Sequence, residues 1–374
     1  MRGFGVLIFI FSVLLAIAIH ELGHFATAKW FKIKVDKFFV GFGPKLWSVR
    51  KGETEYGVAA FPLGGYVKIA GMNPLEEVPP EDAPRTFKSK PGWQRAIVLA
   101  AGSVTHFIVA IIILTSLFAL VGETDVNRAT LVVAEVGSEE LVEPTPSERA
   151  GIEPGDHVVE IAGQRVTVWS DVQQAIRKRP GQTIEIVIER DGVRKALTAT
   201  LDSMERDGET IGFLGVSPEY AVIDRSVPVA FVEATKDVGV GVKDSFLAFG
   251  KIFTPSTMSR LFRVATGQEE RRPEDPASIV GIGRSAGDLA TEGNFAQLFF
   301  VIAGFNVFIG MANLLPLPPL DGGHLAVLAF EKVTRREVDM RRLIPITAMV
   351  LTAFGLLFVL VLSADLFNPL QLPG

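Results

Sequence analysis

The residues of this chain best suited to chemistry are two histidines and a glutamate in the stretch IHELGH at positions 19–24. Residues four apart on an α-helix share a face, so His20 and His24 can offer two imidazoles to one metal ion while Glu21 sits beside them. Two neutral ligands and a carboxylate that can take a proton from metal-activated water are typical of a zinc hydrolase. The alternative is a histidine pair that only packs helices. Residues 3–19 carry no charge, and ionisable side chains in so apolar a segment cost free energy unless they are paired or coordinated, so the sequence favours a metal site.

The elements that must position this site are apolar helices long enough to cross a membrane. The chain has 374 residues, 48% of them hydrophobic, and a mean hydropathy of +0.33, which is high for a soluble protein. Four stretches lack Asp, Glu, Lys and Arg over the roughly 20 residues that a span requires. They are Gly3–Ile19 (extending to Ala28 apart from Glu21), Ala96–Gly122, Phe295–Leu320 and Leu343–Ala364. We expect four transmembrane helices, the first of them retained, because its removal as a signal peptide would discard the candidate ligands.

The distribution of charge predicts the orientation in the membrane. Residues 29–95 hold 12 Lys and Arg against 7 Asp and Glu, residues 331–342 hold 5 against 3, and residues 123–225 hold 11 against 20. By the positive-inside rule the first and last loops face the cytosol, and the central loop and both termini lie outside. At about 1.5 Å per residue, His20 lies roughly 25 Å along its helix, near the cytosolic end of a core about 30 Å thick. We therefore expect a multi-pass protein of the cell membrane with its site near the cytosolic face.

Composition also excludes some partners and ligands. The net charge is −5 and no basic cluster occurs outside the expected cytosolic loops, which argues against a nucleic-acid partner. The chain has no cysteine, so disulfides and thiolate metal ligands are excluded.

Residues 31–95 are expected to form a cytosolic or membrane-reentrant β region. Tyr56–Ala70 has the pattern of a strand, a turn at Gly64-Gly65 and a second strand. One interpretation is a small cytosolic hairpin. The other is a hairpin that enters the membrane beside the metal and offers a strand edge to an extended substrate, which would make Gly64 and Gly65 substrate-binding residues. The pattern does not choose between them. Five prolines within residues 72–91 predict a surface loop.

The second predicted span contains a third intramembrane imidazole, His106. Small residues around Gly102 and Ser103 permit close helix packing there. His106 could hydrogen-bond near the metal, but a single histidine carries no spacing information, so packing is the simpler interpretation.

Residues 123–218 have the pattern of a soluble extracytoplasmic domain. A strand pattern at Thr130–Val136 is followed by the phrase AGIEPGD at positions 150–156, a helical pattern over Ser170–Arg179, and strands at Thr183–Glu189 and Arg194–Leu201. This order and this phrase resemble a PDZ domain, which binds peptide ends or extended segments by strand addition. We expect His157 to be exposed and to have no catalytic part.

Residues 219–294 mix apolar and charged residues too often to span a membrane. Val229–Ile252 fits an amphipathic helix on the outer surface, with Pro228 suited to its first turn, and fits a simple connector with local helix equally well. Residues 268–276 predict a charged loop.

The third span ends in prolines that are followed by an acidic residue. If this helix enters from outside, Asp321 reaches the same cytosolic-side depth as His20 and His24. Zinc held by two imidazoles needs a third protein ligand and an open position, and a carboxylate from another helix supplies that ligand. Prolines between positions 316 and 319 break the helix, which is tolerable where backbone lines a protein-enclosed cavity. Two alternatives stay open, with Asp321 as a turn residue and His324 as a rival ligand.

Together these motifs resemble the site-2 proteases, which are intramembrane zinc metalloproteases of the peptidase M50 type. The similarity is to the bacterial group with a PDZ domain between the second and third core helices, and it covers nearly the whole chain. The motifs that carry it are HELGH at 20–24, VGFGP at 40–44, PLGGY at 62–66 and NLLPLPPLDG at 313–322. One departure lies in the second helix, where the family usually has Gly-Pro-x-x-Asn and this chain has GSVTH at 102–106.

The resemblance implies that His20, His24 and Asp321 bind Zn2+. It implies that Glu21 acts as general base and then as general acid, and that Asn313 helps to hold the substrate or the developing oxyanion. The implied substrate is the transmembrane segment of a membrane protein, such as an anti-sigma factor or a leftover signal peptide, cut in regulated intramembrane proteolysis.

The expected fold is a polytopic α-helical membrane protein with a membrane-associated β-hairpin region and an inserted extracytoplasmic PDZ (α+β) domain. Its parts are the first helix 1–30, the β region 31–95, the second helix 96–122, the PDZ domain 123–218, the amphipathic connector 219–294, the third helix 295–325, a cytosolic loop 326–342, the fourth helix 343–364 and a tail 365–374. A competing function is a non-proteolytic membrane-anchored PDZ scaffold with a structural metal site, which would lose nothing when Glu21 is altered. A metal transporter is disfavoured, because the intramembrane ionisable groups form one layer and no relay across the membrane.

Overall fold

The chain folds into two compact units in the computed structural model, which describes residues 1–73, 78–137, 144–206, 209–272, 275–336 and 338–368. Of the described residues, the first unit comprises Met1–Val121 and those from Ser226 to Asn368. The second unit is Gly122–Arg225, so it is an insertion in the sequence of the first.

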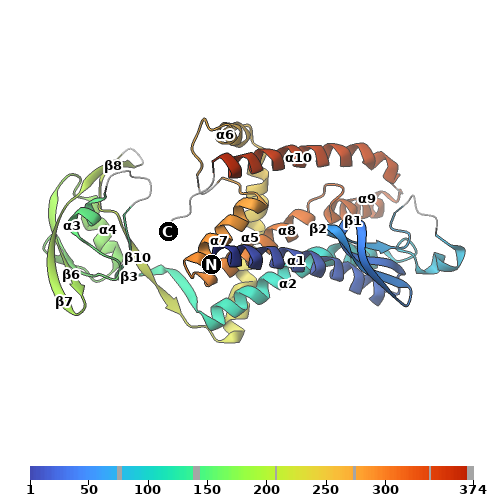
Figure 1. Cartoon of the computed structure of the whole chain (residues 1–374), viewed down its shortest axis with the longest axis horizontal. Helices are drawn as coiled ribbons and strands as arrows, with labels where there is room; N and C mark the ends of the chain where they lie inside the picture. Colours follow the sequence, from blue (N-terminus) through green and yellow to red (C-terminus); the bar gives the residue numbers. More distant parts are fainter. Residues whose placement is uncertain (74–77, 138–143, 207–208, 273–274, 337, 369–374) are drawn as a thin grey trace. The chain divides into compact units, whose positions relative to one another are not determined.

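Within the described residues, four helices of the first unit are long and apolar enough to cross a membrane (Figure 1). They are α1 (Arg2–Trp30), α2 (Gly92–Leu120), α8 (Phe295–Asn313) and α10 (Ile344–Phe367), which continues the short helix η2 (Met340–Leu343). The prediction of four such helices is confirmed. Lipid offers no hydrogen-bond partner to backbone N–H and C=O groups. An α-helix is suited to lipid because these groups bond to one another within the segment.

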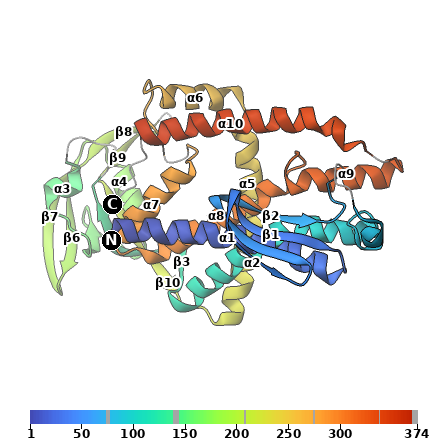
Figure 2. The same ribbon diagram turned by 45° about the vertical axis from the view of Figure 1, so that its right-hand side comes forward.

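Three of these helices form a bundle that the other helices cover. α1 contacts α2, and α2 contacts α8 (Figures 1 and 2). The predicted helix at residues 229–252 is present as α5 (Val227–Ile252), with Pro228 in its first turn. Its buried residues Ala230, Ala234 and Val238 are four apart and face α2 and α8. α7 (Ile279–Thr291) packs on the first half of α1, where Phe9 lies in their shared core.

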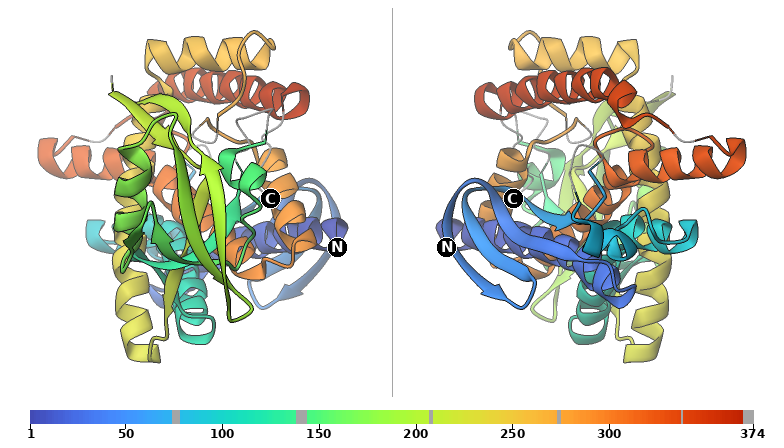
Figure 3. Two further views of the ribbon diagram at one scale, coloured as in Figure 1. Left: turned by 90° about the vertical axis from the view of Figure 1, so that its left-hand side faces the viewer. Right: turned by 90° about the vertical axis from the view of Figure 1, so that its right-hand side faces the viewer.

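β1 (Val35–Lys51) and β2 (Thr54–Ile69) form an antiparallel sheet against α1 (Figure 3). The chain turns at residues 52–53, and β2 itself reverses direction between Val58 and Gly65, because Phe39 and Val40 pair in one direction with residues 57–58 and in the other with residues 65–66. The predicted reversal near Gly64-Gly65 is therefore present, within a segment that stays hydrogen-bonded as part of β2. Both strands bend, so that Phe39 pairs with Tyr66 on one side and with Gly57 on the other. In the described chain, residues 65–69 pair only with β1 and form an edge of the sheet.

Charged contacts join this sheet to the end of α1. Lys29 in the last turn of α1 pairs with Glu53 in the strand turn, and Arg85 donates to the same carboxylate at 2.8 Å. Hydrogen bonds from Lys29 and Arg85 lower the pKa of Glu53 below its ordinary value, although desolvation opposes them. Arg85 is the last residue of the helix η1 (Pro80–Arg85), so Glu53 links the end of α1 to the end of η1.

A non-helical segment, residues 314–320, separates α8 from α9 (Asp321–Thr334). The backbone amides of Leu314 and Leu315 close the last turn of α8, and the amide of Leu320 donates to the carbonyl of Leu317 at 2.9 Å. α8 ends at Asn313 and not at Leu320, because the prolines that follow cannot continue a helix. The turn delivers Asp321 as the first residue of α9.

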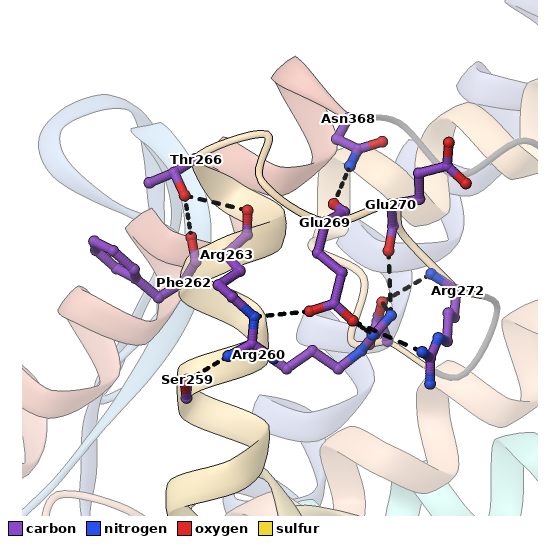
Figure 4. A network of polar contacts seen from close by, with 10 residues as sticks. Ser259, Arg260, Phe262, Arg263, Thr266, Glu269, Glu270, Arg272 and Asn368 are labelled. Carbon is purple, nitrogen blue, oxygen red and sulfur yellow. Dashed lines mark hydrogen bonds and ion pairs between the residues drawn. The ribbon is translucent and has the colours of Figure 1, made fainter.

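A polar network joins α6 (Pro255–Ala265), the loop that follows it and the end of α10 (Figure 4). Glu269 accepts hydrogen bonds from Arg260 and, at 2.8 Å, from Arg263, and these arginines lower its pKa below the ordinary value. Asn368 donates to the backbone carbonyl of Glu269 at 3.0 Å. The charged loop predicted at residues 268–276 thus holds three segments together.

The second unit is built around one mixed sheet-and-helix core. Its main sheet has the order β10-β3-β4-β6-β7, with β5 paired to β4, and β8 and β9 form a separate hairpin. The strands are β3 (Glu123–Val136), β4 (His157–Ile161), β5 (Gln164–Arg165), β6 (Thr183–Arg190), β7 (Val193–Thr200), β8 (Asp202–Arg206), β9 (Glu209–Phe213) and β10 (Val216–Ile223), and the helices are α3 (Pro146–Ala150) and α4 (Trp169–Arg177). Trp169 and Val172 of α4 are buried against the strands. His157 is exposed on β4, as predicted.

The second unit extends beyond the predicted boundary at residue 218. β10 runs antiparallel to β3, with Ile223 opposite Glu123, and Arg225 donates to the Glu123 carboxylate at 2.8 Å. This pairing could not be predicted from local patterns, because the two strands are about a hundred residues apart. The first and last residues of the unit therefore lie side by side.

Candidate metal centre

α1 places both histidines of the first motif on one face. His20 and His24 are one helical turn apart, and their Nε2 atoms are 3.2 Å from each other. Both side chains are largely buried between α1 and its neighbours. The helix therefore presents two imidazole nitrogens to one point.

α9 brings a carboxylate to the same point. The Oδ2 atom of Asp321 lies 3.4 Å from Nε2 of His20 and 3.3 Å from Nε2 of His24. These three are the described residues that could hold a metal ion together, since their ligand atoms all lie within 4.8 Å of one another. The chain folds this way because the prolines end α8 and the following turn starts α9 at Asp321.

The spacing of these atoms fits zinc. Ligands placed tetrahedrally at 2.0–2.1 Å from zinc are about 3.3 Å from one another. The three observed separations are 3.2, 3.3 and 3.4 Å. Oδ2 of Asp321 is buried and accepts no well-formed hydrogen bond from any described residue, as expected of an atom whose partner is a cation. The residues present therefore fit a zinc ion with an open fourth position.

The two histidine rings are held differently. Nδ1 of His24 donates to the backbone carbonyl of Val98 in α2 at 2.7 Å, which leaves Nε2 free to bind metal. Nδ1 of His20 is buried and has no hydrogen-bond partner among the described residues. Gly102 of α2 lies against both rings, and a Cβ there would come within 2.6 Å of His20.

Glu21 lies between the histidines and the edge of the sheet. Its carboxylate interacts electrostatically with both histidines and with Asp321. β2 passes so close that a Cβ at Gly65 would lie 2.7 Å from Cγ of Glu21. The carboxylate of Glu21 therefore lies beside the three candidate ligands but is not one of them.

Other residues singled out in the sequence lie outside the three-residue cluster. Asn313 is the half-buried last residue of α8, and within the described chain its side chain makes no hydrogen bond. His324 is in the first turn of α9 and is not part of the cluster. Gly64 lies in β2 beside Gly65.

The structure also shows a neighbour that spacing alone did not predict. His106 is buried in α2, with its ring centroid 5.1 Å from that of His20, and Asn306 of α8 hydrogen-bonds to it. The signal in the sequence was the departure from the family pattern at this position, which marks the residue without giving its contacts.

Two imidazoles and a carboxylate that converge within a bundle of membrane-length helices, with a further carboxylate beside them, define a membrane-associated metallohydrolase of the HExxH class. Comparison with known proteins makes this more specific. Peptidase family M50 matches residues 8–361, and the chain belongs to this family. The resemblance to the site-2 proteases is confirmed.

Curated relatives match over most or nearly all of their length. The zinc metalloprotease Rip1 of Mycobacterium tuberculosis is 34% identical over 98% of this chain and 98% of that protein. Rip1 of Mycolicibacterium smegmatis is 33% identical over 100% of this chain and 99% of that protein. The metalloprotease MmpA of Caulobacter vibrioides is 32% identical over 89% and 87% of the two chains. The protein is therefore a zinc metalloprotease with Zn2+ as its cofactor.

Proposed function

We propose that this zinc metalloprotease hydrolyses peptide bonds within the transmembrane segments of membrane proteins. The observation that carries the proposal is the buried cluster of His20, His24 and Asp321 inside a bundle of membrane-length helices. A site so placed meets a peptide bond that lies in the membrane more readily than one in a soluble chain. The class of substrate would be single-span proteins such as anti-sigma factors or signal-peptide remnants in regulated intramembrane proteolysis.

We assign His20, His24 and Asp321 as the residues that hold Zn2+. When bound, the ion would polarise the scissile carbonyl and make water acidic enough to attack near neutral pH. Glu21 takes the proton of the attacking water and later delivers it to the leaving amine. Electrostatic interaction with both histidines and the close approach of β2 at Gly65 support this role for Glu21. Asn313 is assigned to the substrate or its developing oxyanion.

The edge of the sheet supplies a place for the substrate. A peptide bond inside a helix is shielded by its own turn, so cleavage requires an extended segment. Residues 65–69 are paired on one side only, and Gly65 lies so close to α1 that a Cβ there would be 2.7 Å from Cγ of Glu21. A substrate strand added along this edge, at Gly64 and Gly65, would pass directly beside the general base. This supports the membrane-reentrant interpretation of the β region over a simple cytosolic hairpin.

The second unit is assigned as an extracytoplasmic PDZ domain. Its order of strands and helices, with α3 followed by Gly151 in the left-handed conformation and by β4, supports this assignment. It would act on substrates as a filter of size or as a binder of trimmed peptide ends. The charge distribution supports a cell-membrane location with the active site near the cytosolic face.

The test is cleavage of a model single-span substrate by the full-length protein in membranes, with wild type compared with Glu21→Gln at equal expression. We expect the rate to fall by at least about 10²-fold in the variant, because general acid–base catalysis is removed while the three ligands remain. The zinc content of the purified variant should equal that of wild type.

A matched control is Glu292→Gln, at an exposed glutamate that ends α7. This variant should cleave as wild type does. Equal cleavage by wild type and Glu21→Gln would reject the assigned base and point to another enzyme in the membranes. Absence of cleavage by wild type across several single-span substrates would favour a membrane scaffold with a structural metal site.

A further inference from the structure

We infer that His106 and Asn306 together position the His20 ring for metal binding, whereas the sequence favoured helix packing for His106 over a hydrogen bond near the metal. His106 takes the place for His20 that the carbonyl of Val98 takes for His24. The inference rests on the proposed ligand set. His106 lies against the ligand His20, and Asn306 acts through His106, so both are positioning residues.

The orientation of Asn306 is fixed by its own hydrogen bonds. Its Nδ2 donates to the backbone carbonyl of Ile302, one turn earlier in α8, at 2.9 Å. Its Oδ1 then faces His106, whose Nδ1 is 3.0 Å away. A carbonyl oxygen only accepts, so the proton of this contact is on Nδ1 of His106. In the neutral imidazole the other nitrogen, Nε2, carries no proton and is an acceptor.

His20 has the complementary requirement. A histidine that binds metal through Nε2 carries its proton on Nδ1 and normally donates it to a protein acceptor. In the described chain, Nδ1 of His20 is buried without such a partner. The rings of His20 and His106 have centroids 5.1 Å apart and planes inclined at 45°. Two imidazoles joined by an N–H···N hydrogen bond have centroids about 5 Å apart, so a rotation of the rings without displacement suffices to form one.

Burial makes this chain of side chains consequential. His106 is 3% exposed and Asn306 is 2% exposed, so water is not a ready substitute for either partner. The bond between Asn306 and His106 joins α8 to α2 at the level of the candidate ligands. Gly310, one turn further along α8, also packs against His106. The pair therefore couples the spacing of α2 and α8 to the direction of the His20 ring.

The test measures zinc binding by purified full-length protein with a competing chelator, for wild type, His106→Phe, Asn306→Leu and the double variant. We expect each single variant to bind zinc about 10–100-fold more weakly, as loss of an outer hydrogen-bond partner does in other metal sites. The double variant should be no weaker than the worse single variant, because both act through one chain of contacts. Cobalt-substituted protein should show an altered visible spectrum in each variant.

Two further variants separate positioning from general damage to the bundle. His106→Gln keeps a hydrogen-bonding side chain and should recover part of the lost affinity. Leu114→Ala, at a buried residue of α2 two turns away, should lower thermal stability and leave zinc affinity and the cobalt spectrum unchanged.

Wild-type zinc affinity and cobalt spectrum in His106→Phe would overturn the inference while leaving the proposed ligand set intact. Loss of zinc affinity in Leu114→Ala equal to that in His106→Phe would also overturn it, because the effect would then belong to helix packing. If the wild type cleaves substrate and the His20→Ala variant keeps its zinc, the proposed ligand set is overturned, and this inference with it.

Discussion

Gly102 sets how closely α2 can approach the candidate metal ligands. An added methyl group at this position would meet Cε1 and Nε2 of His20 at 2.6 Å and would crowd Nε2 of His24. α2 also contributes the carbonyl of Val98 that accepts from His24 and the ring of His106 that lies beside the His20 ring, so both rings are confined by the same helix. The spacing of the three ligand atoms thus depends on the absence of one side chain.

We therefore expect Gly102→Ala to weaken zinc binding by about 1–3 kcal/mol, the usual cost of forcing an extra methyl group into a packed site. The measurement is chelator competition on the purified protein, with substrate cleavage as a second readout. Gly304→Ala is the matched control, because a Cβ at this position in α8 meets no described atom within 4 Å. That variant should keep its zinc and gain up to about 1 kcal/mol of helix stability. Unchanged zinc affinity in Gly102→Ala would contradict the predicted crowding.

Some of the site was predictable at the scale of residues and some was not. His20 and His24 follow from helical periodicity, and Asp321 follows from its expected depth, so each could be placed from the sequence. Asn306 could not, because its contact with His106 joins positions 200 residues apart and no spacing rule connects them. The direction of the His20 ring depends on tertiary contacts, which a motif does not contain.

At the scale of elements, α10 is attached to its neighbours mainly at one end. In the described chain its main contacts are with α6, with α7 and with η2, from which it continues. Asp365 near its end forms an ion pair with Arg271, and both side chains are 1% exposed. The same carboxylate accepts a hydrogen bond from the backbone amide of Ser278, the residue that caps α7, at 2.6 Å. One buried carboxylate thus joins α10 to the loop that precedes α7 and to the start of α7 itself.

Removal of one partner of this pair leaves a buried charge without compensation. We expect Arg271→Met to lower the free energy of unfolding by about 3–5 kcal/mol, and Arg271→Met with Asp365→Leu to recover part of that loss. Thermal unfolding of the purified protein measures the stability, and limited proteolysis of residues 266–278 measures the attachment of the loop. Arg263→Met is the control, because its pair with Glu269 is more exposed and should contribute about 1 kcal/mol or less. Equal stability of wild type, Arg271→Met and the double variant would show that the pair does not anchor α10.

Elements were predicted better than the way they pair. The four apolar helices and the helix at α5 follow from uncharged length and from the position of Pro228. The reversal expected near Gly64-Gly65 lies between Val58 and Gly65, because glycine favours a change of chain direction. The pairing of residues 65–69 with β1, which makes them an edge of the sheet, joins segments distant in the sequence and could not be predicted from this pattern.

At the scale of the whole molecule, the second unit has its own buried core and its own buried charge. Asp156 is fully buried, receives two hydrogen bonds from Arg190 at 2.6 and 2.8 Å, and caps the amide of Glu153. Burial alone would raise the pKa of Asp156, but the bonds from Arg190 outweigh it and lower that pKa below the ordinary value. A carboxyl whose folded pKa is depressed stabilises the fold above its unfolded pKa of about 4 and loses that contribution as pH falls toward the folded value.

We accordingly expect the second unit to lose about 1–3 kcal/mol of stability as pH falls below about 4, the contribution of hydrogen bonds to a charged group. Hydrogen exchange of β4 and β6 in the full-length protein, corrected for the intrinsic pH dependence, should show the loss. Asp156→Asn should be less stable at neutral pH and should have a flatter pH profile. Glu153→Gln, at a largely exposed partner of the same arginine, should behave as wild type. A profile in Asp156→Asn as steep as in wild type would assign the acid sensitivity to other groups.

The pairing of β3 with β10 has a consequence for how proteins of this kind diversify. Because Glu123 and Ile223 are opposite one another, the chain enters and leaves the second unit at adjacent points. Loop-closure entropy changes little with the length of what lies between such points. Because its two ends are adjacent, the inserted unit can be replaced by recombination with a domain of different size and specificity. The connectivity of the protease unit does not change in such an exchange. Substrate range and catalytic chemistry can then evolve on separate parts of one chain.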